Sequence, residues 1–295
     1  MKLKEFIKSA FTQTNSSSGL KGFADTLSTR NNLMPVLFTS HRSPRDIPLS
    51  REECPFWSSL HELGGILREK YEPKAILMIS AHWCTNGTYV NVSDEQEQVY
   101  DYHDFPPPCY EPKYRAKGAP EVAHEVSQII PSVRETQDWG LDHGAWPLLM
   151  HLFPQADVPV FQMSLNYGAK PIYHYELGQQ LKSLREQGVL VIGSGALIHN
   201  PQILNERMST GDFSPWGWEA EYDTWLKKQL KARAFEKVIF YESTHPFSSL
   251  AAPTPDHFVP VLYPLGMTDR QDTIRFFYDD TPTTAFSELS FIVHR

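Results

Sequence analysis

The stretch "KAILMISAHW", residues 74–83, joins the strongest strand signal of the chain to a histidine. Four consecutive apolar residues, 76–79, are typical of a strand that is covered on both faces. His82 and Trp83 follow at the point where such a strand leaves the core. The stretch therefore predicts a buried sheet that carries a histidine at one edge.

Similar apolar runs recur along the chain, with segments of helical periodicity between them. The predicted strands are 34–40, 74–80, 158–165, 188–195 and 237–243, and the predicted helices are 56–70, 119–130, 171–188 and 216–237. This alternation predicts a single α/β domain over 31–295, with a central, mainly parallel, twisted sheet and helices on both faces. Residues 1–30 are interpreted as an N-terminal helix or arm and a polar linker.

Composition limits the partners. The 295 residues include 27 Lys and Arg against 35 Asp and Glu, a net charge of −8, which argues against a nucleic acid or an anionic membrane surface. Cys54, Cys84 and Cys109 lack C-x-x-C spacing, which indicates free thiols in a reducing, cytoplasmic compartment. Cys84 lies two residues from His82, and a small buried side chain is favoured there over a metal ligand or a nucleophile.

Histidines follow several of the predicted strands. They are His41 after 34–40, His82 after 74–80, His199 after 188–195, and His245, with His257 beyond it, after 237–243. Sites of open α/β sheets lie beyond the carboxyl ends of their strands, and imidazole is a ligand for Zn, Fe, Cu and Ni. Single histidines in such places are usually structural, so residue types alone leave a metal site and a structural role equally open.

Five stretches together resemble the 4,5-DOPA extradiol dioxygenase-like group of the class III, LigB-type extradiol ring-cleavage dioxygenases. They run in the family's order from residue 34 to about 266: "MPVLFTSHRSP", "ILMISAHW", "WGLDHGAWPLLMHLFPQADVPVFQMSLN", "VLVIGSGALIHN" and "PTPDHFVPVLYPLG". The resemblance implies that 31–295 is a catalytic domain with one mononuclear divalent metal, usually Fe(II) and in some cases Zn(II). It also implies that O2 is used to cleave the ring of a small aromatic diol, a DOPA-like catechol.

The resemblance also implies roles for individual histidines. His41, His82 and His257 match the metal ligands, and His199 matches a residue that is either a fourth ligand or an acid–base catalyst. His143, in "LDHGAW", matches a histidine of the substrate pocket and suits acid–base catalysis together with His199. Asp256 and Glu242 are candidate carboxylate partners of the metal, and orientation of a ligand histidine is the favoured role for both.

Three residues are expected to contact substrate. Trp83 is placed to pack against the aromatic ring, and His103 lies in a proline-rich loop that matches a family loop near the substrate. Arg42 and Ser40 replace the glycines that usually flank the first histidine of the family. Arg42 is interpreted as a substrate-carboxylate ligand, with a surface cation and a partner of an acidic side chain that holds the altered turn as alternatives.

Two other function classes fit the same residues. A zinc hydrolase would activate water at such a site. A non-catalytic metal-binding relative would explain the loss of both glycines beside His41.

Overall fold

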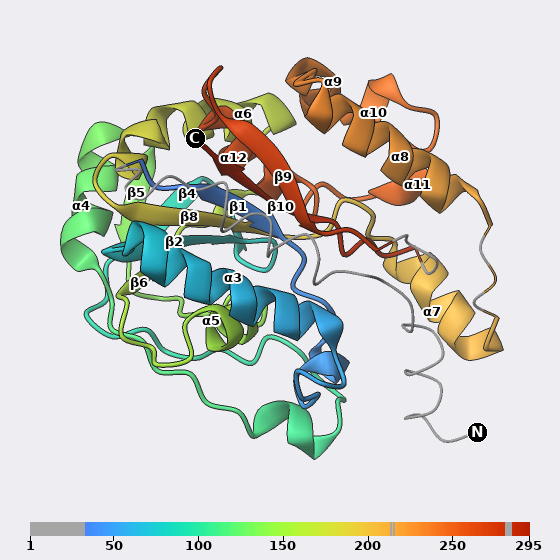
Figure 1. Ribbon diagram of the computed structural model, residues 1–295, viewed down its shortest axis with the longest axis horizontal. Coiled ribbons are helices and arrows are strands. Elements are labelled where there is room, and N and C mark those ends of the chain that lie inside the picture. The colour runs from blue at the N-terminus through green and yellow to red at the C-terminus, as the bar shows by residue number, and fades with distance from the viewer. Residues whose placement is uncertain (1–32, 213, 215, 281–284) are drawn as a thin grey trace.

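The computed structural model describes residues 33–212, 214, 216–280 and 285–295, so the helix and linker predicted for 1–30 lie outside the described residues. A six-stranded sheet forms the centre of the molecule, in the order β6-β2-β8-β1-β10-β9 (Figure 1). In the part of the chain that the structure describes, no helix is long and apolar enough to cross a membrane.

Four neighbouring strands of this sheet are parallel, as the sequence predicts. They are β6 (Val160–Gln162), β2 (Ala75–Ser80), β8 (Val189–Ser194) and β1 (Val36–Thr39). The predicted strand 158–165 is divided, because its last residue belongs to β7 (Leu165–Asn166), which pairs with β3 (Cys84–Thr85) in a separate small sheet. Another two-stranded sheet pairs β4 (Thr88–Asn91) with β5 (Val133–Thr136).

Two strands near the C-terminus were not predicted. β10 (Ser290–His294) pairs antiparallel with β1, and β9 (Thr273–Tyr278) pairs antiparallel with β10. They make the sheet mixed, although it remains mainly parallel. β10 is buried along its whole length and lies between β1 and β9 in the sheet (Figure 1).

The strands bury alternate side chains in two core clusters, one on each face of the sheet. Leu37, Ile76 and Met78 pack with apolar residues of helices α3 (Pro55–Tyr71) and α5 (Trp146–Leu152). Phe38, Leu77 and Ile79 pack on the other face. The helices of that face include α4 (Pro120–Ile129), α6 (Pro171–Gln180), α8 (Trp218–Lys231) and α12 (Leu262–Gly266). The predicted covering of both faces is therefore confirmed (Figure 1).

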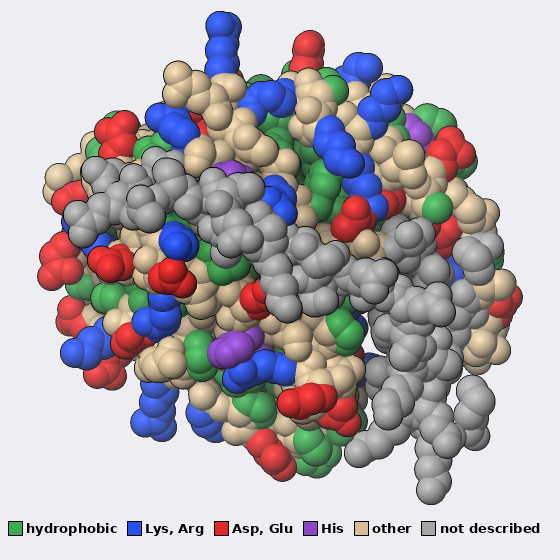
Figure 2. Space-filling model, in the orientation of Figure 1, with side chains coloured by type: hydrophobic (Ala, Val, Ile, Leu, Met, Phe, Trp, Pro, Cys, Tyr) green, Lys and Arg blue, Asp and Glu red, His purple; other side chains and the backbone are tan. Residues whose placement is uncertain are grey.

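The remaining helical elements are short, apart from α7. They include α7 (Pro201–Thr210), α11 (Ser248–Ala251), and the 3-10 turns η1 (Pro44–Asp46), η2 (Pro107–Tyr110), η3 (Leu181–Arg185) and η4 (Val259–Val261). The predicted helix 171–188 is thus divided into α6 and η3. The face seen in Figure 2 carries acidic and basic side chains interspersed over its surface.

The predicted strand 237–243 is wrong, because this stretch forms α9 (Phe235–Ile239) and α10 (Tyr241–Thr244). Val238, Ile239 and Tyr241 are buried in the core, whereas Phe240 is exposed. A short apolar run does not distinguish a buried strand from a buried helix. His245 therefore does not end a strand, and its ring packs 5.2 Å from that of Tyr222 and 5.0 Å from that of Trp225.

Candidate metal centre

The ends of three neighbouring parallel strands are aligned, and two of the site histidines follow directly from them. Ser194 at the end of β8 pairs with Thr39 of β1 on one side and with Ser80 of β2 on the other. His41 and His82 each come two residues after the last residue of their strand. The sheet register therefore brings His41 and His82 together across β8, as the strand-end argument predicts.

Three further histidines join this pair from other parts of the chain. His143 comes from the loop before α5, and His199 from the loop between β8 and α7. His257 lies before η4, and its carbonyl accepts a hydrogen bond from the amide of Ala196, just beyond β8, at 2.8 Å. Five of the six histidines expected near the sheet edge thus form one cluster, and His245 lies elsewhere.

The rings of His41, His82 and His257 form a nearly equilateral triangle. Their centroids are separated by 4.9 Å, 5.0 Å and 5.2 Å. His143 is next to this triangle, 3.9 Å from His82 and 5.3 Å from His41 between ring centroids. Ligand atoms of His41, His82 and His143 lie within 4.8 Å of one another, as do those of His199, Asp256 and His257.

A serine fixes the proton position on His41. The hydroxyl of Ser194 donates to the carbonyl oxygen of Gly144 at 2.5 Å, and Ser194 Oγ is also 3.1 Å from His41 Nδ1. Since the hydroxyl has one proton, and that proton is directed at the carbonyl, Nδ1 of His41 is the donor in the second contact. The Nε2 atom of neutral His41 therefore carries a lone pair.

Carboxylates fix the proton position on three other imidazole rings of the cluster. Asp101 Oδ2 lies 3.1 Å from His82 Nδ1 and 2.9 Å from His143 Nδ1. Asp256 Oδ2 lies 2.5 Å from His257 Nδ1. Because ionised carboxylates only accept hydrogen bonds, these Nδ1 atoms are donors and the Nε2 lone pairs remain available. The second predicted carboxylate, Glu242, is exposed on α10.

Two of these lone-pair atoms face each other. His41 Nε2 and His82 Nε2 are 3.1 Å apart, and a cation is needed between them, either a proton or a metal ion. At a metal–nitrogen distance of ~2.1 Å, two ligands of one ion lie roughly 3.0–3.4 Å apart. Because the rings of His143 and His257 lie next to this pair and also carry Nε2 lone pairs, a metal ion can satisfy more of these lone pairs than a proton can. The residues therefore fit a mononuclear divalent metal.

His199 is placed differently from the others. Its ring stacks on that of His257, with 3.6 Å between centroids and 10° between planes. A metal ion lies close to the plane of an imidazole that binds it, so one ion cannot lie in both of these nearly parallel planes. His199 Nδ1 is also buried and has no hydrogen-bond partner among the described residues. These contacts distinguish His199 from the triangle of rings.

Burial and mutual repulsion keep most of these rings neutral. Burial, with the nearby His82, lowers the pKa of His41 well below its usual value. Burial lowers the pKa of His199 to about 2, and that of His257 to about 4 despite the carboxylate of Asp256. Burial also opposes the charged form of His82, but the hydrogen bond to Asp101 and the negative charges of Asp142, Asp101 and Asp256 together outweigh it and raise the pKa. Neutral imidazole is the form that binds metals.

A buried aspartate organises the loop that carries His143. Asp142 accepts hydrogen bonds from Ser80 Oγ at 2.6 Å and from the amide of Gly144 at 2.9 Å. The side chains of Gln162 and Trp139 donate to its other oxygen. A Cβ at Gly144 would lie 2.2 Å from Ser80 Oγ, so only glycine allows this approach of the loop to the end of β2.

The residues predicted to contact substrate differ in their surroundings. Trp83 is buried and stacks on Trp139, with 6.2 Å between centroids and 8° between planes. His103 is exposed in the loop that also contains Asp101. Cys84 is exposed at the two-residue strand β3, so its predicted burial is wrong.

Arg42 is buried instead of exposed to solvent. Its Nε lies 3.0 Å from Asp46 Oδ2, and its Nη1 is paired with Glu288 Oε1. The side chain is 4% exposed, which rules out the surface-cation interpretation. The backbone of Arg42 has a φ of 60°, in the left-handed region that glycine adopts most readily. The geometry therefore favours the interpretation in which Arg42 holds the altered turn beside His41 over recognition of a substrate carboxylate.

Sequence reasoning missed several of the groups that hold the histidines. Asp101, Asp142 and Ser194 were not identified, and neither was Glu288. Ser194 was detectable as the last residue of a predicted central strand. No local pattern separates Asp101 from the other acidic residues, because its partners lie 19 and 42 positions away in the chain.

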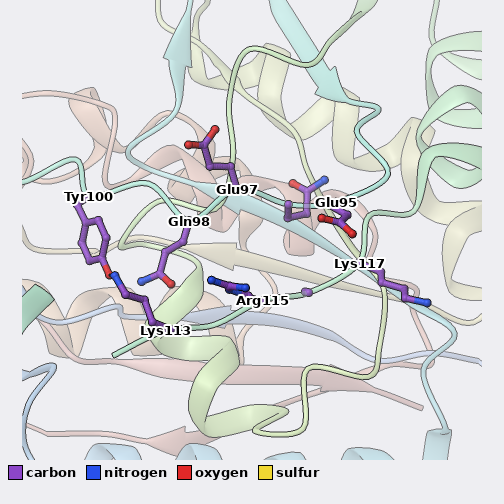
Figure 3. Close-up of a pocket in the computed structure, with 9 residues that line it drawn as sticks. Glu95, Glu97, Gln98, Tyr100, Lys113, Arg115 and Lys117 are labelled. Carbon is purple, nitrogen blue, oxygen red and sulfur yellow. The ribbon is translucent and has the colours of Figure 1, made fainter. Parts of the chain in front are cut away.

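A separate groove of about 600 Å³ contains none of the histidines (Figure 3). It lies over two extended segments, 95–100 and 113–117, which are joined by a bridge between Glu95 and Lys117. One segment carries the acidic residues Glu95 and Glu97, and the other carries the basic residues Lys113, Arg115 and Lys117 (Figure 3). Opposite charges on neighbouring extended segments are typical of a solvated surface.

Fold and site together define an α/β enzyme with a histidine-lined metal centre at the sheet edge. Residues 35–287 match the LigB family, the catalytic LigB subunit of aromatic ring-opening dioxygenase. The chain therefore belongs to the LigB family of extradiol ring-opening dioxygenases.

Its relatives include proteins named 4,5-DOPA dioxygenase extradiol. That of Beta vulgaris is 39% identical over 81% of this chain and 89% of its own length. That of Escherichia coli K12 is 31% identical over 87% of this chain and 93% of its own length. A crystal structure of an uncharacterized Escherichia coli K12 protein superposes with a TM-score of 0.73 at 30% identity, covering 88% of this chain and all of that one.

Proposed function

We propose that this chain is an Fe(II)-dependent enzyme that cleaves the ring of a DOPA-like catechol with O2. The observation that supports a bound metal ion is that His41 Nε2 and His82 Nε2 face each other at 3.1 Å. The Nδ1 protons of both rings are directed at oxygen acceptors. Relatives named for 4,5-DOPA support the substrate class. Three free cysteines suit the cytoplasm.

In this proposal His41, His82 and His257 hold the ion. Their ring centroids are almost equally spaced, and each has its Nδ1 occupied by an oxygen acceptor. His143 packs too closely on His82, at 3.9 Å between centroids, to be the favoured third ligand. A bound ferrous ion would lower the pKa of the catechol hydroxyls and bring the ring and O2 together.

The proposal gives His143 and His199 the proton transfers. His143 keeps a lone pair on Nε2, and the carboxylate at its Nδ1 stabilises the positive charge that it acquires on taking a proton from a catechol hydroxyl. Burial holds His199 neutral, so its free nitrogen can accept a hydrogen bond from the second hydroxyl. The substrate roles of Trp83 and His103 are kept as predictions. For Arg42 we favour support of the turn.

The test uses protein reconstituted with Fe(II) without oxygen and then supplied with a catechol panel. Uptake of O2 with a yellow ring-fission product supports the proposal. Cleavage of esters or amides by the zinc-loaded protein, without O2 uptake, would support the hydrolase instead. The family and its relatives do not favour the hydrolase or the non-catalytic alternative.

A further inference from the structure

Asp101 contacts two histidines of the cluster at once. Its Oδ2 lies 3.1 Å from His82 Nδ1 and 2.9 Å from His143 Nδ1. Its Oδ1 also accepts a hydrogen bond from the backbone amide of His143 at 2.9 Å. The carboxylate side chain is only 10% exposed, so water competes weakly for these contacts.

We propose that Asp101 is a positioning residue that sets the tautomer and the orientation of His82 and His143 together. The inference rests on the proposed function, in which His82 binds the metal and His143 transfers a proton. Both side chains then depend on one carboxylate. Loss of that carboxylate would therefore weaken metal binding by His82 and also change the orientation of His143, the proton acceptor.

Hydrogen-bond chemistry supports the tautomer assignment. The nitrogen of a neutral imidazole that carries the proton is set by the hydrogen bond that the ring makes. An ionised carboxylate only accepts, so Asp101 selects the Nδ1–H form of both rings. Each Nε2 is then a lone pair, as a metal ligand or a general base requires.

No other carboxylate can replace it in this position. Asp142 is occupied by four donors, none of which is an imidazole. Asp256 contacts the ring of His257. Among the described residues, Asp101 is therefore the one carboxylate with ion-pair contacts to two rings of the cluster.

The contacts also predict that an amide cannot substitute for the carboxylate. If Asn stood at position 101, one orientation would put its NH2 group against the Nδ1 atoms of His82 and His143. The other orientation would put NH2 against the backbone amide of His143, which is also a donor, and against its Nδ1, which lies 2.9 Å from both oxygens of Asp101. Either way a donor faces a donor, and at least one ring must change its tautomer or move.

The experiment compares the wild-type chain with Asp101→Asn and with Asp104→Asn as a matched control. Asp104 lies in the same loop, is exposed, and has a φ of 61°, which Asn tolerates. Competition with a chromophoric chelator measures zinc affinity. Long-range ¹H–¹⁵N correlation spectra of the zinc-loaded, ¹⁵N-histidine-labelled chains at pH 8 report the tautomer of each ring.

We expect His143 to be the Nδ1–H tautomer in the wild type. Asp101→Asn should weaken zinc binding by about 10–100-fold, as loss of a residue that orients a metal ligand does, and should change the His143 spectrum. Asp104→Asn should leave both unchanged.

Zinc affinity of Asp101→Asn within threefold of the wild type, or an Nε2–H tautomer of His143 in the wild type, would overturn the inference. The wild-type spectrum decides even if the variant does not fold. Neither readout uses O2 or a catechol, so failure of the proposed ring cleavage would be seen separately, as absence of O2 uptake by an intact zinc-binding protein.

Discussion

The imidazole of His199 stacks on that of His257, with 3.6 Å between ring centroids and 10° between ring planes. The resemblance alone left His199 as either a fourth ligand or an acid–base residue. Since a single ion cannot lie in both ring planes, the stack favours the acid–base role.

His199→Gln tests this role. We expect the variant to keep the metal content of the wild type and to lose turnover by about 10²–10⁴-fold, the usual effect of removing a general acid or base. Metal analysis and O2 uptake on the same preparation measure the two effects. Loss of the metal with His199→Gln would show that the residue is a ligand.

The third ligand is tested by comparing His257→Ala with His143→Ala. His257→Ala should lose most of the bound metal, because it removes one ring of the equilateral triangle. His143→Ala should keep the metal and lose turnover. Elemental analysis of both variants measures occupancy, and the reverse pattern would assign the third position to His143.

Arg42 should stabilise the fold. Arg42→Ala leaves Glu288 buried without this cation, a change that costs about 3–5 kcal/mol in comparable buried pairs. Burial raises the pKa of Glu288 to about 7 even with Arg42 present, so the double variant Arg42→Ala/Glu288→Gln should recover part of the loss. Urea unfolding measures all three chains, and a loss below about 1 kcal/mol for Arg42→Ala would contradict this role.

The substrate role of Arg42 has its own test. If the guanidinium supports the turn, Arg42→Lys should weaken binding of carboxylated and unsubstituted catechols equally. A loss confined to carboxylated catechols, on the order of 1.5–3 kcal/mol, would instead show that Arg42 binds the substrate carboxylate. Dissociation constants for the two ligand types decide between the roles.

His151 should make the fold sensitive to acid. It is buried, its ring stacks 4.5 Å from that of Trp57, and neither ring nitrogen has a hydrogen-bond partner among the described residues. Burial, with the nearby Arg51, lowers its pKa to about 4. The unfolded chain therefore binds more protons between pH 6.5 and 4, and stability falls as pH decreases through that window.

His151→Phe keeps a flat ring against Trp57 and removes the titration. Relative to this variant, the wild type should lose about 3 kcal/mol of unfolding free energy between pH 6.5 and pH 4. Denaturant unfolding at several pH values measures the difference. If the unfolding free energies of the two proteins had the same dependence on pH, the pKa of His151 would be the same in the folded and unfolded chain, against this prediction.

The strands that place the site were predictable where the pattern is continuous. The apolar runs ending before His41 and His82 correspond to β1 and β2, and the parallel register brings the two rings together. The stretch 237–243 was misassigned because its buried face belongs to two short helices, which an apolar run alone does not reveal.

The parts that were not predicted depend on distant contacts. β10 joins the sheet by antiparallel pairing with β1, and β9 by antiparallel pairing with β10; the alternation of predicted strands and helices does not predict such pairs. Asp101 reaches His82 and His143 only because the loop after β4 passes beside both, and loop paths are set by the tertiary fold. Local sequence therefore indicated several ligand-type residues but not the groups that orient them.

The most direct test of the account is stoichiometric. The wild-type chain and His82→Ala are loaded with Fe(II) without oxygen, and metal content, O2 uptake and loss of a catechol are then measured together. We predict one iron per wild-type chain, one O2 consumed per catechol cleaved to a yellow product, and neither iron nor uptake with His82→Ala. Full iron occupancy in His82→Ala, or an iron-loaded wild type that consumes no O2 with any catechol, would contradict the account.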